Sequence, residues 1–356
     1  MATPRRQLLA GLLSAAVLTV TACSTGGSSG GATSGANGAN GANGANGANG
    51  ANGANGATRS VENIDGTAVR VPEHPTRIVT LSEPTTDAVL ALGLRPIGVV
   101  SGRGQSTVSN YLADRARGIP ILGGIAQPNY EAIGAAKPDL ILVDGTSINN
   151  NAEAIETLRH IAPTVYTGYA GGDWCANLKT VATAVGEPAK GTQLLADYDE
   201  RVRSLAERLA KAGYATKTFS IVRWQGNSAS LVLLELPPGE ALTDLGLKRP
   251  PSQNHRGRGH SEPVSLENLG TIDADYMFFG TLGGSSVGNP DAGGSADTAA
   301  ARAALTQAEK TPGFARLTAA REGHIIPVDG SVWTSTGGPI LMNDIVDDVQ
   351  KALLDR

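Results

Sequence analysis

The chain has 356 residues, of which 40% are hydrophobic and 17% are charged, a composition typical of a soluble globular protein. Its formal net charge is −4, so nothing in the charge balance favours a nucleic-acid partner. The length predicts two domains once a non-globular amino terminus is set aside. Aromatic residues make up only 4% of the chain, which makes the position of each tryptophan and tyrosine informative.

Residues 1–22 have the features of a signal peptide. Arg5 and Arg6 precede an apolar run from Leu8 to Val20, which is too short to span a bilayer and fits a signal-peptide core. The run ends in small residues directly before Cys23, a pattern that resembles the bacterial lipobox. The resemblance implies cleavage before Cys23, a diacylglyceryl group on its sulfur, and a mature protein tethered to a membrane. A plain secretory signal with a chance cysteine is the alternative, and the export route, Sec or twin-arginine, stays open.

Residues 23–58 predict a flexible tether. The segment consists almost entirely of small and polar residues and contains seven consecutive Gly-Ala-Asn triplets between Gly35 and Asn55. It lacks the proline of a collagen-like helix and has almost nothing to bury. We expect a mean reach of roughly 30–35 Å, which keeps a folded domain near a lipid surface without holding it against that surface.

Residues 59–186 alternate strand and helix patterns, which predicts βα units and a parallel sheet in an amino-terminal lobe. The lobe opens with a hairpin from Val61 to Val71, whose turn is expected at Asp65-Gly66. Further strands are expected at 77–81, 96–100, 140–143 and 164–166, and helices at 85–92, 130–136, 151–160 and 174–185.

Residues 187–213 predict one long helix. Apolar side chains recur at intervals of three and four residues, at Leu194, Leu195, Tyr198, Val202, Leu205 and Leu209. Opposite charges four residues apart, such as Asp197 and Arg201, are expected to pair on the other face. At roughly 35–40 Å in length, the helix would be as long as a small domain is wide. We interpret it as a rigid connection between two lobes; one long surface helix in a single domain is the alternative.

Residues 214–356 predict a carboxy-terminal lobe of the same class. Strands are expected at 219–224, 230–234, 276–279 and 324–328, and helices at 241–245, 265–272, 298–309 and 339–354.

Two pairs of segments repeat between the lobes in the same order. Glu131 begins EAIGAAKPDLILV and Glu267 begins ENLGTIDADYMFF, which share the Glu, a Gly, an Asp and an apolar strand at matching positions. The segment LGLRP from Leu92 likewise matches LGLKRP from Leu245. The predicted fold class is therefore α/β: two α/β lobes with mainly parallel central sheets, joined by one long backbone helix, with a ligand cleft between the lobes.

These segments together resemble the iron-siderophore substrate-binding proteins of ABC importers, a group that includes the cobalamin binder. The resemblance covers Val61 to Leu354 and includes the lobe opener RIVTLSEPTTDAVLALGLRPIGVV and the ending VWTSTGGPILMNDIVDDV. It implies a monomeric lipoprotein on the outer face of the cell membrane that captures a ferric siderophore and delivers it to ABC permease subunits. None of the motifs identifies the siderophore.

The resemblance assigns permease docking to Glu131 and Glu267. In that family one exposed glutamate per lobe enters an arginine-lined pocket of the permease. Two carboxylates held apart by a stiff helix can engage two subunits at once, so the second contact gains from effective concentration. Each glutamate also suits the first turn of a helix, where its interaction with the helix dipole would stabilise the helix by about 0.3–1 kcal/mol.

Arginines at strand ends predict the ligand-binding wall, because ligands of α/β proteins sit outside the carboxyl ends of the strands. Arginine offers a planar fork of donors to carboxylate, catecholate and hydroxamate oxygens, and large aromatic rings can pack on a metal chelate without coordinating the metal. The predicted ligand-binding residues are Arg103, Arg223, Trp224, Trp333, Tyr169, Arg256 and Arg258.

A bare-metal site is weakly supported, because it would require several histidines and a carboxylate to meet in the cleft. Only His255 and His260 share a loop. We therefore expect the iron to arrive already chelated, with no metal site and no cofactor belonging to the protein. Haem, cobalamin or a metal ion bound to the same scaffold is the alternative.

Signatures of enzymes are absent from the sequence, which contains no GxSxG, P-loop, HExxH or CxxC motif. No basic activator can be assigned to Cys175, so a reactive thiol has no support. We expect a binding protein and not an enzyme; an anchored α/β enzyme or adhesion module is the alternative class.

Overall fold

The computed structural model describes residues 56–355 except 146, 149–150, 170–171, 258–260 and 285–293. The expected signal peptide, the expected lipidation residue Cys23 and nearly all of the expected tether lie outside the described residues. In the described ranges, no helix is both long and apolar enough to cross a membrane. All of the elements belong to one compact unit, Ala54–Arg356.

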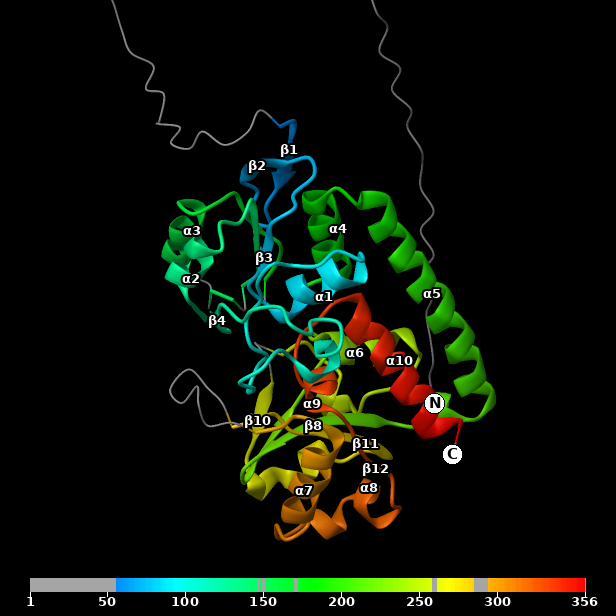
Figure 1. Ribbon diagram of the computed structural model, residues 1–356. Helices are drawn as coiled ribbons and strands as arrows, with labels where there is room; N and C mark the ends of the chain where they lie inside the picture. The colour runs from blue at the N-terminus through cyan, green and yellow to red at the C-terminus, as the bar shows by residue number, and fades with distance from the viewer. Residues whose placement is uncertain are drawn as a thin grey trace, which may run out of the picture. The chain divides into compact units, whose positions relative to one another are not determined.

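A three-stranded parallel sheet with the order β3-β6-β7 forms the centre of the amino-terminal lobe, and Figure 1 shows β3 between α1 on one side and α2 and α3 on the other. Alternate residues of β6 face opposite sides. Leu140 and Leu142 pack toward α1 and α4, whereas Ile141 and Val143 pack toward α2 and α3. A sheet covered on both faces explains why its strands are continuous apolar runs. The lobe contains β1 (Thr58–Glu62), β2 (Ala68–Pro72), β3 (Ile78–Thr80), α1 (Glu83–Ala91), η1 (Asn110–Leu112), β4 (Gly123–Gly124), β5 (Gln127–Pro128), α2 (Tyr130–Ala135), β6 (Leu140–Val143), α3 (Ala152–Arg159), β7 (Thr164–Tyr166) and α4 (Trp174–Val185).

Two local predictions for this lobe differ in outcome. The hairpin is confirmed: β1 and β2 pair antiparallel, and Gly66 turns the chain with a φ of +80°. Its first strand begins at Thr58, one residue inside the expected tether. The strand expected at 96–100 is reduced to single parallel bridges at Gly98 and Val99, so it extends the sheet without a regular ladder.

A five-stranded sheet with the order β10-β9-β8-β11-β12 forms the centre of the carboxy-terminal lobe. Its strands β8, β11 and β12 are parallel, as predicted, whereas β9 and β10 are added antiparallel on one side. The connection from β8 to β9 is only the turn at Gly226 and Asn227, and so short a turn can join only antiparallel strands. The lobe contains η2 (Tyr214–Thr216), β8 (Phe219–Gln225), β9 (Ser228–Leu231), α6 (Pro237–Asp244), η3 (Pro251–Gln253), β10 (Glu262–Val264), η4 (Leu266–Ile272), β11 (Tyr276–Gly280), α7 (Thr298–Ala308), η5 (Phe314–Arg316), α8 (Thr318–Arg321), β12 (Ile325–Pro327), α9 (Gly330–Trp333) and α10 (Pro339–Leu353).

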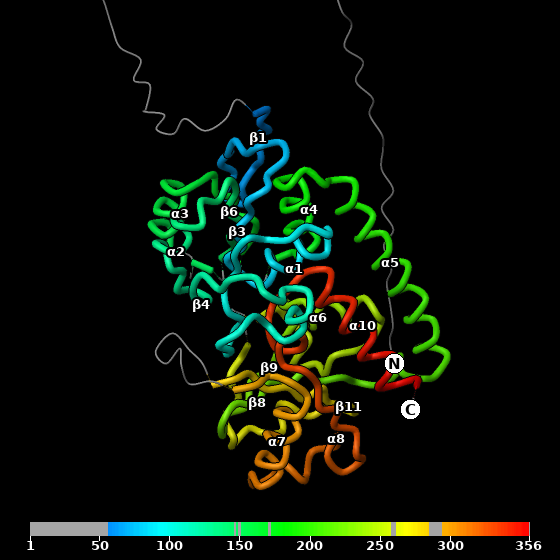
Figure 2. Tube along the Cα trace, viewed as in Figure 1, coloured from blue at the N-terminus to red at the C-terminus, as the bar shows by residue number. Residues whose placement is uncertain are grey.

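The predicted connecting helix is confirmed as α5 (Pro188–Lys211), which runs without a break for 24 residues. The helix contacts α4 of the amino-terminal lobe and α6 and α10 of the carboxy-terminal lobe, and its path along both lobes can be followed in Figure 2. The expected pairing of Asp197 with Arg201 is wrong. Arg201 instead donates to Asn343 Oδ1 at 2.7 Å and pairs with Asp347, so its charge ties α5 to α10.

One hydrophobic core runs through both lobes. It joins Val89 of α1, Leu178 of α4, Leu205 of α5, Leu242 of α6 and Leu341 of α10 into a single cluster of buried residues. Each lobe also has a smaller core on the far side of its own sheet. Opening the lobes as rigid bodies would expose part of the shared core to water. This would cost free energy in proportion to the apolar area exposed. We therefore expect the lobes to move little relative to each other.

The internal repeat has a structural counterpart in both lobes. Asp139 accepts hydrogen bonds from the backbone N–H groups of Thr76 and Arg77 just before β3, at 2.8 and 2.9 Å. Asp275 likewise accepts one from the N–H of Thr218 before β8, at 2.8 Å. Both aspartates thus fix the start of the neighbouring parallel strand, which explains their matching positions. The two Leu-Gly segments also correspond, since each glycine ends a helix with a positive φ.

Candidate functional site

Arg103 and Arg223 approach each other from opposite lobes. Arg103 lies in a tight loop of the amino-terminal lobe, closed by a hydrogen bond from Gly102 N–H to the Thr107 carbonyl at 2.8 Å. That loop touches the carboxy-terminal lobe, because a Cβ added to Gly104 would lie 2.8 Å from the Gly283 carbonyl oxygen. Arg223 projects from β8, where its guanidinium donates to the Thr334 carbonyl at 3.5 Å and to the Ser261 hydroxyl.

The electrostatics of this arginine pair favour an anion. Burial, and next the positive charge of Arg103, lower the pKa of Arg223 to about 10. The Arg223 guanidinium therefore stays charged at neutral pH and is repelled by the positive charge of Arg103 in a partly desolvated space. An anionic group placed between them would relieve the repulsion and accept charge-assisted hydrogen bonds from both.

A narrow crevice lies between the lobes, and neither Arg103 nor Arg223 is among the residues that line it. It is linked to Arg103 through Glu83, which contacts both the Arg103 backbone and the crevice residue Thr336. Tyr169 stands at this crevice with 52% of its surface exposed and its ring edge-on to Tyr166. Its contact with a ligand stays a prediction. The crevice is lined by Pro84, Asp144, Tyr169, Gly172, Trp174, Asn177, Pro237, Thr336 and Gly337.

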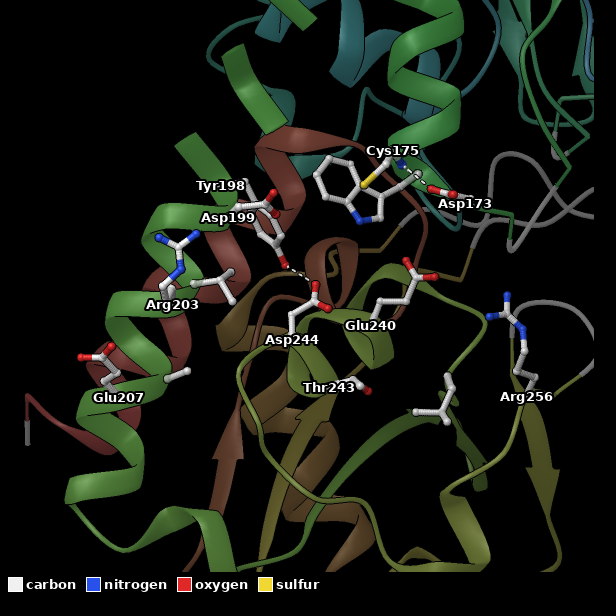
Figure 3. A pocket seen from close by; sticks show the side chains of 14 residues that line it. Asp173, Cys175, Tyr198, Asp199, Arg203, Glu207, Glu240, Thr243, Asp244 and Arg256 are labelled. Atoms are coloured by element: carbon white, nitrogen blue, oxygen red, sulfur yellow. Dashed lines mark hydrogen bonds between the residues drawn. The ribbon is translucent and has the colours of Figure 1, made fainter. Parts of the chain in front are cut away.

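Trp174 also borders a larger cavity of about 850 Å³ beside α5 (Figure 3). The cavity lies between the start of α4, one face of α5, and α6. Glu240 reaches into it from α6 toward Cys175, and Tyr198 donates to Asp244 Oδ2 at 2.9 Å. Burial, followed by repulsion from Asp173 and Asp244, raises the pKa of Glu240 to about 7. The cavity thus combines aromatic surface with an acidic wall.

Cys175 on the cavity wall is a free, half-buried cysteine. Burial and the neighbouring Asp173 charge raise the pKa of its thiol to about 12. The sulfur therefore stays protonated at neutral pH and is a poor nucleophile.

The predictions for Trp224 and Trp333 are corrected by their burial. Trp224 is 1% exposed and is enclosed by Phe279 and Phe314 in the core of the carboxy-terminal lobe. Trp333 is completely buried, stacked 4.0 Å from Phe278, and donates its indole N–H to Asp348 at 2.7 Å. Both rings are enclosed in hydrophobic cores, and neither presents a face to a ligand.

The remaining basic and histidine candidates are divided between two places. Arg256 lines the 850 Å³ cavity, where its positive charge lowers the pKa of Glu240 and partly offsets the effect of burial. Arg258 and His260 lie outside the described residues. His255 Nε2 lies 3.4 Å from Glu262 Oε2. In the described parts of the chain, no group of three or more His, Cys, Asp or Glu side chains is arranged to hold a metal ion.

Glu131 and Glu267 both occupy the first turn of a short helix, α2 and η4 respectively. Their side chains are exposed, and across the described ranges no hydrogen bond or ion pair occupies either carboxylate. The two are thus available for a partner, although docking itself stays a prediction. The helix expected at 265–272 is a 3₁₀ helix with a kink at Asn268.

Two buried acids of α1, Glu83 and Asp87, were missed by the sequence analysis. Each accepts hydrogen bonds from the segment between α9 and α10 of the opposite lobe. A usable signal was present: two carboxylates four residues apart, directly after a buried strand, share one helix face with no basic residue on the helix.

The chain is similar to known proteins along most of its length. Residues 78–332 match the family described as periplasmic binding protein. The chain is 32% identical over 302 residues to the probable siderophore-binding lipoprotein YfiY of Bacillus subtilis (strain 168), covering 83% of this chain and 88% of that protein. It is 25% identical over 279 residues to the achromobactin-binding periplasmic protein of Dickeya dadantii (strain 3937), with coverages of 78% and 86%.

Solved structures share the fold. SirA of Staphylococcus aureus complexed with staphyloferrin B superposes with a TM-score of 0.68 at 24% identity, over 83% of this chain and 98% of that one. FeuA of Bacillus subtilis complexed with ferri-bacillibactin gives a TM-score of 0.67 at 20% identity, over 84% and 99%. Together with the matched residues, these similarities confirm the resemblance inferred from the sequence: the chain belongs to the periplasmic binding protein family.

Proposed function

We propose that this chain is the siderophore-binding lipoprotein of an ABC importer, which captures a ferric siderophore between its lobes and delivers it to the membrane permease. The observation that carries the proposal is the Arg103–Arg223 pair, two charged guanidiniums from opposite lobes in a partly buried space. The names of the relatives, a siderophore-binding lipoprotein and an achromobactin-binding protein, support the same ligand class.

The arginine pair selects the outer surface of an anionic chelate. The siderophore keeps the iron coordinated, so the metal is cargo and the protein supplies no ligand to it. Each guanidinium offers parallel N–H donors that match carboxylate or catecholate oxygens. Tyr169, half exposed at the crevice, offers a ring face for the organic part of the chelate. This role requires binding and release and no catalysis.

The shared core and α5 support a nearly preformed site. The same buried cluster contains residues of both lobes and of the connecting helix. A site that is already assembled has little conformational entropy to lose when the ligand binds.

Delivery would use the exposed glutamates and the amino-terminal anchor. Glu131 and Glu267 begin corresponding helices in the two lobes and are exposed, which suits basic pockets on two permease subunits. A diacylglyceryl group on Cys23 would keep the monomeric protein at the outer face of the cell membrane, next to that permease. Relatives named as lipoproteins support this location.

The proposal is tested by calorimetric titration of the chain from Ser24 onward with a fixed panel: the iron(III) complexes of citrate, staphyloferrin B, achromobactin and bacillibactin, the iron-free forms, haem and cobalamin. We expect at least one ferric complex to bind more tightly than its iron-free form. Arg103→Ala and Arg223→Ala should each weaken that binding at least tenfold, since each removes a charge-assisted contact. Binding of haem or cobalamin alone would reassign the ligand.

A further inference from the structure

The Glu83 carboxylate lies at the junction of three chain segments. It is 3% exposed, and its Oε1 accepts hydrogen bonds from the Arg103 backbone N–H at 2.8 Å and from the Ser109 hydroxyl at 2.9 Å. These two donors begin and end the loop that carries Arg103. The same Oε1 accepts a third hydrogen bond, at 3.2 Å, from the hydroxyl of Ser335 in the opposite lobe, and Oε2 lies 3.5 Å from the Thr336 hydroxyl.

A short series of bonds continues from this carboxylate to the other arginine. Ser335 directly follows Thr334, whose carbonyl oxygen accepts from the Arg223 guanidinium at 3.5 Å. Thr334, Ser335 and Thr336 are all buried, and the Thr334 hydroxyl is fixed by a 2.8 Å bond to the Gly330 carbonyl. The Arg103 main chain and the Arg223 side chain are therefore both connected to Glu83, one from each lobe.

Asp87 fixes the same interlobe segment one helical turn further along. Its carboxylate accepts from the backbone N–H groups of Gly338, Ile340 and Leu341 at 2.9, 2.9 and 3.0 Å. Residues four apart lie on one face of a helix, so α1 presents both acids to the segment 335–341. Asp87 anchors the start of α10, and Glu83 holds the part of the segment nearest the arginines.

A buried carboxylate is costly unless its oxygens are hydrogen-bonded. An apolar side chain at position 83 would fill the same space without that cost, but it could not gather donors from two lobes. The arrangement is therefore suited to setting geometry. Its hydrogen bonds hold the base of the Arg103 loop and the residue next to the Arg223 acceptor. A shift of either backbone segment would change the distance between the two guanidiniums.

We propose that Glu83 is a positioning residue for ligand binding, which fixes the separation of Arg103 and Arg223 between the two lobes so that both engage one anionic chelate. This inference rests on the proposed function in that it takes the arginine pair as the ligand contact. On this view a residue that does not itself contact the ligand controls the affinity for the ligand.

The first test is the affinity of Glu83→Gln for the ferric complex of the panel that wild type binds most tightly. The matched control is Glu153→Gln, the same change at an exposed acid in the first turn of α3. We expect roughly a tenfold or greater loss of affinity for Glu83→Gln, because its neutral carbonyl oxygen accepts more weakly than a carboxylate oxygen from the three donors gathered on Oε1, and no change for the control. Wild-type affinity in Glu83→Gln would overturn the proposal.

A double-mutant cycle separates positioning from general stability. If Glu83 acts through Arg103, adding Glu83→Gln to Arg103→Ala should cost little further affinity, whereas independent effects would multiply. Multiplied losses would therefore contradict a positioning role. If Glu83→Gln fails to fold, Ser335→Ala replaces it, because this change removes only the donor from the opposite lobe. We expect Ser335→Ala to lower the affinity less than Glu83→Gln would, since it removes a single hydrogen bond. Unchanged affinity in Ser335→Ala would equally overturn the proposal.

A second measurement needs no ligand. Spin labels at Glu131→Cys and Glu267→Cys, with Cys175→Ser in the background, report the distance between the lobes by pulsed electron paramagnetic resonance. We expect one narrow distribution with Glu83 intact and a broader one in Glu83→Gln; an unchanged distribution contradicts the proposal whether or not a ligand is known. If wild type and control bind nothing on the panel while the distribution broadens, the proposed function fails and the structural role of Glu83 stands.

Discussion

The Asp87 carboxylate of the amino-terminal lobe caps a helix of the other lobe: its Oδ1 accepts from the Ile340 backbone N–H at 2.9 Å in the first turn of α10. The residue at the N-cap position of that helix is Gly338, which has no side chain to satisfy the free N–H groups. Asp87 does so from across the lobe boundary and also complements the helix dipole. The interlobe contact is therefore part of the folding of α10 itself.

Removal of this cap is expected to destabilise the whole unit. Asp87→Ala leaves three buried N–H groups without an acceptor, and each such group typically costs about 1–3 kcal/mol. We expect a loss of about 3–5 kcal/mol in the free energy of unfolding, measured by urea denaturation. The same change at the exposed Asp114 should alter stability by less than about 0.5 kcal/mol. A loss at Asp87 no larger than at Asp114 would mean that water replaces the cap.

The ionisation of Asp87 should also be visible in the pH dependence of stability. Burial is the largest effect on this group and raises its pKa to about 6, against the lowering effect of the three backbone hydrogen bonds. The folded state thus binds a proton more tightly than the unfolded state, so its contribution to stability is greatest below about pH 4 and falls as the pH rises through 6. Relative to Asp87→Asn, wild type should gain up to about 3 kcal/mol between pH 7 and pH 4. Parallel curves for the two proteins would contradict the raised pKa.

Glu240 in the cavity wall gives a second pH-dependent prediction. Its pKa is raised to about 7, first by burial and then by Asp173 and Asp244, so the charged form is disfavoured in the folded state. At pH 8 wild type bears this cost and Glu240→Gln does not. We expect the variant to be more stable by on the order of 1 kcal/mol after allowance for partial solvent screening. The difference should vanish near pH 4.5, as measured by thermal unfolding at the two pH values.

The correction for the tryptophans can be tested directly. Trp333→Phe keeps a ring next to Phe278 but removes the donor to Asp348, so we expect a loss of stability of about 1–3 kcal/mol. Ligand affinity should stay within twofold of wild type in this variant and in Trp224→Phe. A tenfold loss of affinity in either variant, with the fold intact by circular dichroism, would restore that ring to the ligand wall.

Docking predicts a separation of transport from binding. Glu131→Ala and Glu267→Ala should each reduce iron uptake by cells while leaving the calorimetric affinity of the purified protein unchanged. Both side chains are exposed, and within the described residues neither carboxylate makes a hydrogen bond or ion pair, so we expect the fold to tolerate their loss. Glu153→Ala serves as the exposed control. Equal loss of ligand affinity would show that the assignment to the permease is wrong.

The elements with strong local signals could be predicted from the sequence. The connecting helix follows from its apolar period, and the repeat from the paired Glu, Gly and Asp spacing, which the bonds of Asp139 and Asp275 now explain. The mixed sheet of the carboxy-terminal lobe was not predicted, although the two-residue turn after β8 required an antiparallel neighbour.

The site was harder to predict than the fold, because it depends on the direction in which each side chain points. Arg223 and Trp224 are consecutive strand residues, so they must point to opposite faces of the sheet, and only one could reach the cleft. The hydrogen-bond partners of Glu83 and Asp87 could not be predicted for another reason. Their partners lie about 250 residues away in the chain, and no local pattern encodes so distant a contact.

That distance also bears on how the protein matures. Asp87 precedes its partner Gly338 by 251 residues, so during synthesis from the amino end almost the whole chain must emerge before the Asp87 carboxylate meets its hydrogen-bond donors. Contacts so remote in sequence form slowly, and the early lobe remains a target for proteases in the meantime. A gene truncated before the codon for Pro339 should consequently yield fragments that are degraded. We do not expect such fragments to fold and bind the ligand.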